Sequence, residues 1–434
     1  MAGDSNKTPK RLIVLCDGTW QNAVNVESYD YPTNVTRFSR ALSQFGERDG
    51  KFVPQIIYYQ PGVGTGVADK ITGGVYGAGL SANVRAAYGF LAHNYNPGDQ
   101  IYFFGYSRGA YTARAIAGLI TSLGLLTKKG MDRFHSVYQE YYHPKDEPKA
   151  GNDRKPNVEK LQQLAGDELH EGAKDAIEIV GVWDTVGFHK AGWMGEEFEF
   201  YNTRLSDKVS HGFHALSLDE TREAFLPTLW ESNTNDAGGK NAKQVWFCGE
   251  HGIGGGSKDS DLADISLAWM IAECYKTKKL SFVDLDGDPA TSYLLAGGTD
   301  AAALDTAEAE QETAQWKTAL YPKAEESFMG IAALRKGATK LLWTLSNWVL
   351  PGKSGVRKPN ENAFEPGETN ERIHQSIRDR RLGRGEWPCT PIKGRMGGEE
   401  SKLWELTRKT GAVLEETVPD VIELKLKGRI RPVT

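Results

Sequence analysis

Residues 100–117 read QIYFFGYSRGAYTARAIA and place an apolar strand, a glycine-rich turn and a helix in immediate succession. The strand at 101–104 is aromatic and β-branched, and the turn-forming run Asn-Pro-Gly-Asp at 96–99 precedes it. Residues 105–109 then form the pattern G-x-S-x-G around Ser107. In this context the pattern is typical of a nucleophile elbow, whose strained turn exposes the serine Oγ at the edge of a sheet. A glycine-rich turn with an ordinary hydroxyl is the alternative.

The composition of the 434-residue chain is that of a globular protein, with 39% hydrophobic and 25% charged residues. A net charge of −5 gives no electrostatic footprint for nucleic acid. The four cysteines are widely spaced and lack a C-x-x-C pair, so neither a disulfide framework nor a metal site is predicted. No apolar run reaches the roughly 18 residues of a membrane span. The N-terminal residues lack the apolar core of a secretory signal, so we expect a cytoplasmic protein.

Further apolar runs predict the other strands of a mostly parallel sheet, and the helical patterns between them indicate an α/β fold. The strands are expected at residues 11–16 (RLIVLC), 55–59 (QIIYY), 175–183 (DAIEIVGVW) and 243–248 (KQVWFC), the last clear strand. Helices are expected at residues 34–45, 81–95 and 262–274. Residues 214–225 (HALSLDETREAF) are also predicted to be helical, with Asp219 and Arg222 spaced to form an ion pair.

Three of the predicted strands end in loops that together carry the residues of nucleophilic catalysis: Ser107, Asp184 and His251. A serine needs an imidazole to accept its proton, and a carboxylate fixes the tautomer of that imidazole. The chain order of nucleophile, acid and histidine is that of the α/β hydrolases. Other residues could take the second and third roles, namely His189, His211 and His214 for the base, and Asp219 and Asp261 for the acid.

The loop after the first strand reads Asp17-Gly18-Thr19-Trp20 and lies where α/β sheets place ligands. It precedes the nucleophile in the chain, as does the loop that supplies one oxyanion donor in α/β hydrolases. The backbone N–H of Arg108 is expected to supply the other donor. The predicted oxyanion hole is therefore Arg108, Gly18 and Thr19. The predicted substrate-binding residues flank these loops and are Asp17, Trp20, Tyr106 and Thr185.

Two glycine-rich loops, PGVGTG at 61–66 and GAGLSA at 77–82, resemble dinucleotide-binding fingerprints. The first has Val67 where the third glycine belongs, and the second does not directly follow a strand. Neither is followed at about twenty residues by a convincing acidic residue. We therefore expect no organic cofactor and interpret both as flexible loops near the mouth of the site.

Several blocks within residues 11–273 resemble one family when taken in order. The blocks are LIVLCDGTWQN, YYQPGVGTG, GYSRGAYTAR, GVWDTVG, ALSLDETREAF and WFCGEHGIGGG followed by LADISLAWM. They look like the α/β hydrolases related to the Tle-type phospholipase effectors of bacterial type VI secretion. The resemblance implies an α/β hydrolase fold, puts Ser107, Asp184 and His251 on the triad positions and implies no cofactor. The chain departs from the family pattern at Glu250, where a carboxylate could raise the histidine pKa or bind a cation.

The resemblance also implies esterase or phospholipase activity on acyl lipids, so we expect a serine hydrolase that acts on small-molecule or lipid esters. An amidase or thioesterase would use the same triad, and a lipid- or protein-binding scaffold without catalysis is the alternative of a different class.

The chain divides into four predicted parts. Residues 1–10 form a disordered N-terminus, 11–280 an α/β hydrolase core, 281–362 a helical cap or insertion, and 363–434 a C-terminal segment packing on the core. Within the cap, residues 334–350 (LRKGATKLLWTLSNWVL) are amphipathic. They predict either a helix that covers the core or a lid that contacts a membrane surface peripherally.

Overall fold

The computed structural model describes the following residues of the chain. They are 8–18, 32–62, 75–142, 156–187, 204–220, 222, 225–230, 242–256, 261–286, 357, 371–377, 403–405, 413–417 and 423. The amphipathic segment at 334–350 lies outside the described residues, as does most of the predicted cap at 281–362. The predicted division into four parts therefore stays a prediction.

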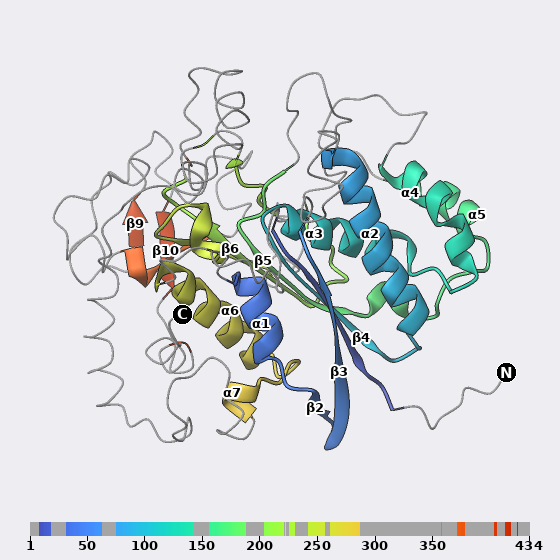
Figure 1. Ribbon diagram of the computed structural model, residues 1–434, viewed down its shortest axis with the longest axis horizontal. Helices are drawn as coiled ribbons and strands as arrows, with labels where there is room; N and C mark the ends of the chain where they lie inside the picture. The colour runs from blue at the N-terminus through green and yellow to red at the C-terminus, as the bar shows by residue number, and fades with distance from the viewer. Residues whose placement is uncertain are drawn as a thin grey trace, which may run out of the picture.

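The described strands form one sheet (Figure 1), in the order β2-β3-β1-β4-β5-β6-β7-β8-β10-β9. Their bounds are β1 Arg11–Cys16, β2 Phe45–Arg48, β3 Lys51–Gln60, β4 Gln100–Tyr106, β5 Ile177–Trp183, β6 His211–Ser217, β7 Ala242–Phe247, β8 Glu371–His374, β9 Leu403–Glu405 and β10 Val413–Thr417. Neighbouring strands are parallel except at the two ends of the sheet, where β2 pairs with β3 and β9 with β10 in antiparallel fashion. The predicted α/β fold with a mostly parallel sheet is confirmed.

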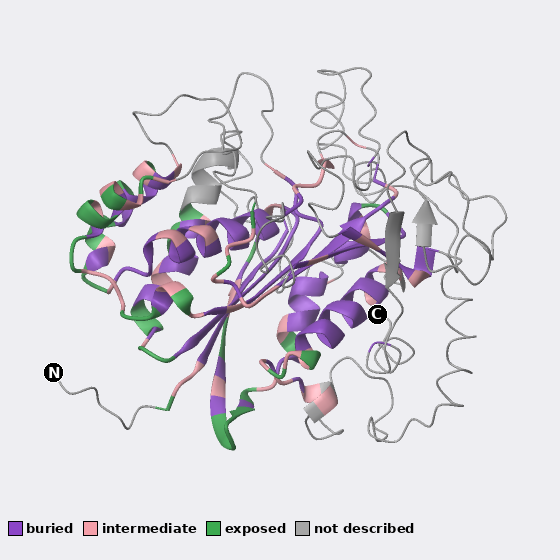
Figure 2. Cartoon of the chain, turned by 180° about the vertical axis from the view of Figure 1, so that it is seen from behind, coloured by how far each residue is buried: buried purple, intermediate pink, exposed green. Residues whose placement is uncertain are grey.

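Helices cover both faces of this sheet. Their bounds are α1 Asn34–Ala41, α2 Val75–Asn94, α3 Arg108–Leu123, α4 Phe134–Tyr142, α5 Val158–Ala165, α6 Asp261–Lys276 and α7 Val283–Asp286, with short 3-10 turns η1 Gly130–Arg133, η2 Ala173–Asp175 and η6 His251–Gly254. One face is covered by α1 and α6 and the other by α2 and α3 (Figure 1). Each face has its own buried core (Figure 2), with Phe38 and Trp269 in one and Tyr88 and Phe103 in the other. Because helices occupy both faces, the open edge for a site is at the carboxyl ends of the strands.

The predicted helix at 214–225 is wrong, because its first residues belong to a strand. Strand β6 lies between β5 and β7 and is parallel to both. Its HGFHALS sequence is buried almost throughout, and burial at the centre of a sheet outweighs the helix-forming residues that follow it. Of the two residues expected to pair, Arg222 forms an ion pair with Glu220, and Asp219 accepts a hydrogen bond from the backbone N–H of Gly249.

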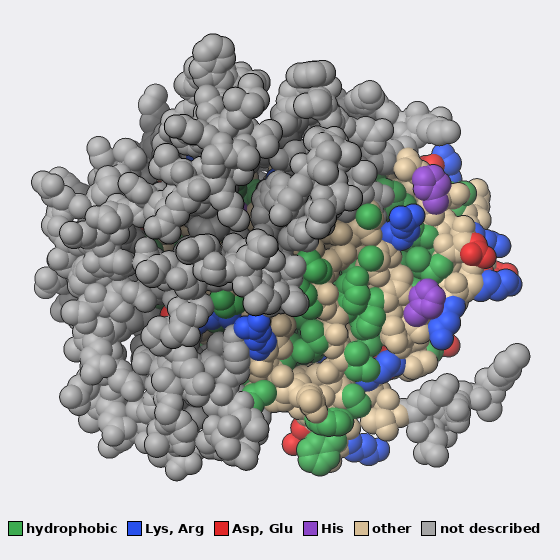
Figure 3. All heavy atoms as spheres, viewed as in Figure 1, with side chains coloured by type: hydrophobic (Ala, Val, Ile, Leu, Met, Phe, Trp, Pro, Cys, Tyr) green, Lys and Arg blue, Asp and Glu red, His purple; other side chains and the backbone are tan. Residues whose placement is uncertain are grey.

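The predicted helix at 34–45 ends earlier, at Ala41, and a hairpin of β2 and β3 follows it. Asp49 and Gly50 connect the two strands with φ values of +53° and +73°. These left-handed values are the ones a two-residue hairpin turn requires. Hydrophobic side chains are exposed on this hairpin (Figure 3), with Phe45 and Phe52 at 54% and 81% exposure. The hairpin turn lies at the amino end of β3, so it is at the opposite end of the sheet from the loops that follow the parallel strands.

The prediction that residues 243–248 form the last strand is also wrong, since the sheet continues beyond residue 280. Strand β8 pairs in parallel with β7, and β10 and β9 extend the sheet further. The Trp246 indole N–H donates to Glu371 Oε2 at 2.6 Å, which joins β7 to β8 through a buried side-chain contact. The four residues of β8 carry too short a pattern to be recognised as a strand without their partner.

Candidate active site

Ser107 lies on the turn between β4 and α3, at the carboxyl edge of the sheet. Its φ of +57° is in the left-handed region, where a non-glycine residue costs about 1–3 kcal/mol and persists only when its surroundings fix it. The Ser107 N–H donates to the carbonyl of Trp183 at 3.0 Å and so ties the turn to the neighbouring strand. A Cβ on Gly109 would lie 2.3 Å from the carbonyl oxygens of Cys16 and Asp17, so glycine is what lets α3 approach β1 this closely. The strand, strained turn and helix occur in the order expected from the sequence.

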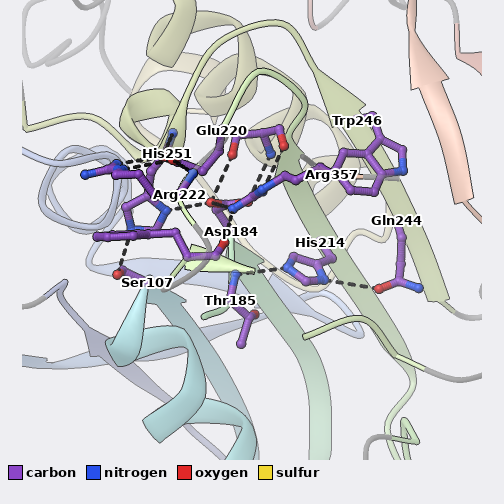
Figure 4. A network of polar contacts seen from close by, with 12 residues as sticks. Ser107, Asp184, Thr185, His214, Glu220, Arg222, Gln244, Trp246, His251 and Arg357 are labelled. Atoms are coloured by element: carbon purple, nitrogen blue, oxygen red, sulfur yellow. Dashed lines mark hydrogen bonds and ion pairs between the residues drawn. The ribbon is translucent and has the colours of Figure 1, made fainter. Parts of the chain in front are cut away.

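The His251 ring bridges Ser107 and Asp184 through its two nitrogens (Figure 4). Nε2 is 2.7 Å from Ser107 Oγ, and Nδ1 is 2.5 Å from Asp184 Oδ2. The ring contacts two aromatic side chains, Tyr106 and Phe225, at centroid distances of 5.0 and 4.7 Å. The Tyr106 hydroxyl also donates to the His251 carbonyl at 2.9 Å. The three residues selected by their order in the chain are therefore hydrogen-bonded in a row.

The Asp184 carboxylate is fully buried at the end of β5. Ser217, at the end of β6, donates to it twice, from its N–H to Oδ1 and from its Oγ to Oδ2, both at 3.0 Å. The guanidinium of Arg357 forms an ion pair with the same carboxylate. Sequence reasoning missed both partners, because Ser217 falls in the stretch read as a helix and Arg357 belongs to no recognisable motif.

The electrostatics of this row follow from its burial and from Arg357. Burial alone would raise the pKa of Asp184, but Arg357 and His251 outweigh it and hold that pKa well below its ordinary value. Burial lowers the pKa of His251, Asp184 raises it, and the positive charge of Arg357 lowers it. The net effect lowers the pKa of His251, so the row consists of an ionised carboxylate, a neutral imidazole and a hydroxyl.

A second carboxylate, that of Glu220, lies next to the histidine loop. Its Oε2 accepts the His251 backbone N–H at 3.3 Å, and its Oε1 accepts the Arg222 Nε–H at 2.8 Å. The Arg222 guanidinium is stacked on the Phe225 ring, 3.9 Å from its centroid. Asp219, one of the two other acids that the sequence allowed, accepts the Gly249 N–H at 2.6 Å. Both acidic residues thus hold the backbone of the histidine loop.

Asp17, predicted to bind substrate, is buried at the start of the loop that follows β1. Its Oδ2 accepts hydrogen bonds from the hydroxyls of Thr33, Thr36 and Tyr59, at 2.8, 3.1 and 2.5 Å. Burial raises the pKa of Asp17 in spite of these hydrogen bonds, each of which lowers it. Its carboxylate therefore fixes the start of the loop and caps the beginning of α1 through Thr33.

The predicted oxyanion donors are partly described. The Gly18 N–H donates to Asp17 Oδ1 at 2.7 Å, which engages one of the amides proposed for the oxyanion hole. Thr19 and Trp20 lie outside the described residues. Arg108 is the first residue of α3 and directly follows Ser107, so its backbone N–H belongs to the first turn of that helix.

Thr185, also predicted to bind substrate, is buried beside His214, one of the histidines that could have served as the base. The Thr185 N–H donates to His214 Nε2 at 3.1 Å, and His214 Nδ1 is 3.1 Å from Gln244 Oε1. Burial is the main cause that lowers the pKa of His214, to about 3. His211 lies at the start of β6, and His189 lies outside the described residues. The structure brings His251, and not His214, to Ser107.

A second set of serine, histidine and carboxylate lies where β8 packs beside β7. His374 Nδ1 is 2.7 Å from Ser376 Oγ, and its Nε2 is 2.8 Å from Glu423 Oε1. All three side chains are buried, and the His374 ring stacks on Phe247 at a centroid distance of 4.6 Å. Because His374 ends β8 and Phe247 ends β7, this set supports the contact between the two strands.

Within the part of the chain that the structure describes, no cluster of His, Cys, Asp and Glu side chains could bind a metal ion. Glu250, suggested as a cation ligand, has a pKa raised by burial first and then by the nearby charge of Glu220. No described helix is both long and apolar enough to cross a membrane.

The fold and site define an α/β protein with a buried row of serine, histidine and aspartate at the carboxyl edge of its sheet. Residues 10–273 match the family described as the catalytic domain of Tle1-like phospholipase effectors of the type VI secretion system. This match covers more than half of the chain, so the chain belongs to that family.

Three relatives are similar to parts of the chain. The uncharacterized protein YEL023C of Saccharomyces cerevisiae is 29% identical over 241 residues, which are 51% of this chain and 33% of the yeast protein. The structure of the Tle1 effector bound to the VgrG spike covers 58% of this chain and 51% of its own, with 17% identity and a TM-score of 0.32. The crystal structure of an uncharacterized protein from Pseudomonas aeruginosa matches 64% of this chain and 47% of its own chain, with 19% identity and a TM-score of 0.39. This chain thus spans about a third of the yeast protein and about half of each solved structure.

Proposed function

We propose that this protein is a serine hydrolase that cleaves carboxylic esters of acyl lipids through a covalent acyl-enzyme. The observation that carries the proposal is the position of His251, whose ring nitrogens contact Ser107 Oγ and Asp184 Oδ2 at once. A hydroxyl, an imidazole and a carboxylate in this row are what an activated serine nucleophile needs. The lipid part of the proposal is supported by the family, which is described as a phospholipase effector domain.

Acylation begins when Ser107 Oγ attacks the ester carbonyl carbon. The Oγ–C bond forms as the hydroxyl proton passes to His251 Nε2. Asp184 accepts a hydrogen bond from Nδ1–H and so stabilises the imidazolium without taking its proton. The developing oxyanion is held by the backbone N–H groups of Arg108 and Thr19, since the Gly18 N–H already donates to Asp17 Oδ1. The C–O bond to the alcohol then breaks, and His251 gives its proton to the departing alkoxide.

Deacylation repeats these steps with water in place of Ser107. His251 takes a proton from the water, whose oxygen attacks the acyl carbon and forms a bond to it. The Oγ–C bond breaks, the proton returns from His251 to Ser107, and the carboxylic acid leaves. Both half-reactions use the same imidazole as base and then as acid.

The activated serine is tested with a fluorophosphonate probe and peptide mass spectrometry. We expect the probe to label Ser107, and we expect labelling to be lost in Ser107→Ala and His251→Ala. The control is Ser136→Ala, since Ser136 is an exposed serine on α4, and it should leave labelling intact. Ser107→Ala should also lower kcat by roughly 10⁴ to 10⁶. A folded wild-type protein that is not labelled at Ser107 would overturn the proposal.

The substrate class is tested by release of fatty acid from phosphatidylcholine vesicles, with Ser107→Ala as the blank. Release by the wild type alone supports a lipid ester as substrate. If Ser107 reacts with the probe and short-chain esters are hydrolysed while the vesicles are not, the serine hydrolase stands and its action on phosphatidylcholine is ruled out.

A further inference from the structure

Arg357 contacts the Asp184 carboxylate although the two residues are 173 positions apart in the chain (Figure 4). Each terminal nitrogen meets one carboxylate oxygen, Nη1 with Oδ1 and Nη2 with Oδ2, the latter at 2.9 Å. Nη1 also donates to the Ser217 carbonyl at 2.8 Å, and Nη2 donates to the Phe225 carbonyl. Both side chains of the ion pair are completely buried. Two backbone carbonyls therefore fix the guanidinium, which binds both oxygens of the Asp184 carboxylate. We call this bidentate contact the fork.

The fork has a geometric consequence for the histidine. A bidentate contact between arginine and a carboxylate sets the plane of the carboxylate as well as its charge. Ser217 adds its two donors to the same group. Because Arg357 and Ser217 fix the Asp184 carboxylate, its Oδ2 faces His251 Nδ1 in a fixed direction. This contact in turn sets the ring so that Nε2 faces Ser107.

We propose that Arg357 is a positioning residue of the hydrolytic site, which acts on His251 through Asp184. It lies outside residues 10–273, the part matched by the family, so this chain completes its site with a residue from beyond that region. The inference rests on the proposed function, because a positioned histidine matters only if Ser107 is the nucleophile. The contact is a fully buried ion pair and not a surface pair, whose effect would be small.

Arg357 also sets the charge balance at His251. Among the described residues, the charged groups with the main effects on the pKa of the ring are Asp184 and Glu220, which favour its protonated form, and Arg357, which disfavours it. Arg222 is paired with Glu220 and reduces the effect of that carboxylate. Removing the charge of Arg357 should therefore favour the imidazolium, which cannot accept the Ser107 proton. The loss should be larger at acidic pH than at neutral pH.

The test measures the second-order rate of fluorophosphonate labelling of Ser107 against pH in the full chain. Arg357→Gln is expected to slow labelling about 10- to 100-fold. This is the loss typical of removing a residue that orients a metal ligand without touching the metal, and Arg357 acts on His251 in a comparable indirect way. The ratio of wild-type to variant rates is expected to grow as the pH falls. Arg357→Lys keeps the charge but not the fork, so it should label more slowly than the wild type, with the pH dependence of the wild type.

The matched control is Arg37→Gln, since Arg37 is another buried arginine paired with an aspartate, Asp264 of α6. It should lower thermal stability without changing the pH dependence of labelling. The proposal is overturned if Arg357→Gln labels at the wild-type rate at every pH. It is also overturned if Arg357→Gln slows labelling by the same factor at every pH while Arg357→Lys labels at the wild-type rate, because neither the bidentate contact nor the charge balance at His251 would then matter.

If Arg357→Gln does not fold, Arg357→Lys decides the question. Labelling by the lysine variant at the wild-type rate over the whole pH range would show that the fork positions nothing. Failure of the proposed function looks different, since the wild type itself would then not react at Ser107. The wild-type measurement thus separates the two.

Discussion

At the scale of single residues, the protonation of His251 is expected to govern the rate. In the proposed mechanism the neutral imidazole accepts the Ser107 proton, so kcat/KM should fall when the pH drops through the pKa of His251 in the free enzyme. Burial and Arg357 lower that pKa by more than Asp184 and Glu220 raise it. The fall of kcat/KM at acidic pH is therefore expected to have its midpoint below about pH 6.5, the ordinary pKa of histidine.

Glu220→Gln should move this midpoint further down, because it removes a negative charge that favours the imidazolium. The measurement is kcat/KM for a soluble ester against pH, alongside thermal unfolding at each pH to show that the protein stays folded. Glu159→Gln is the control, since Glu159 is an exposed carboxylate on α5, and it should leave the midpoint in place. A wild-type midpoint above 6.5 would contradict the lowered pKa of His251, and an upward shift in Glu220→Gln would contradict the influence of Glu220 on that pKa.

The residues of the row could be predicted because each lies beside a strong local signal. Ser107 is in a glycine pattern, and Asp184 and His251 each follow an apolar strand, so parallel topology brings them to one edge. Arg357 could not be predicted in the same way. Its contact depends on where the chain returns after a long excursion, and a lone arginine carries no periodicity or spacing that would reveal it.

At the scale of elements, the turn at Ser107 depends on how closely α3 approaches β1. Gly109→Ala would put a Cβ 2.3 Å from two backbone carbonyl oxygens, which cannot move aside as a side chain can. We expect a loss of about 1–3 kcal/mol or more of unfolding free energy. Labelling of Ser107 should fall as well, since the helix must shift away from the strand.

The control for this change is Gly89→Ala in α2, where the nearest atom to the new Cβ is Met131 Cε at 3.7 Å. That is ordinary contact, and alanine gains about 0.5–1 kcal/mol over glycine inside a helix. Gly89→Ala should therefore be neutral or stabilising in denaturant unfolding. Equal stability of the two variants would show that the approach of α3 to β1 does not require glycine.

The elements predicted with success were those with long, uniform patterns, such as β1, β4 and α6. Strand β6 was read as a helix because its seven residues merge into a run of helix-forming residues. The β2–β3 hairpin was missed although Asp49-Gly50 is a strong turn signal, because its first strand has only four residues. Short strands are stabilised by their neighbours, which a linear pattern does not show.

At the scale of the whole molecule, the C-terminal part of the chain contributes to both the sheet and the site. Strand β8 lies beside β7, and its last residue, His374, makes buried contacts with Ser376 and Glu423. Ser376 also contacts Cys248, which directly follows β7 and precedes the histidine loop. The C-terminal part thus contacts the end of β7 just before the histidine loop, and Arg357 binds the Asp184 carboxylate.

A fragment of residues 1–286 should therefore be inactive even though it includes the whole region matched by the family. It would leave β7 as an exposed, apolar edge strand, which favours aggregation, and it would leave the Asp184 carboxylate buried without its cation. We expect no labelling of Ser107 by the fluorophosphonate probe in this fragment. Co-expression with a second fragment of residues 287–434 should restore labelling, since β8 and Arg357 are then supplied in trans. Labelling of the short fragment alone at the rate of the full chain would contradict this dependence. Both the sheet and the triad carboxylate would then be complete without the last third of the chain.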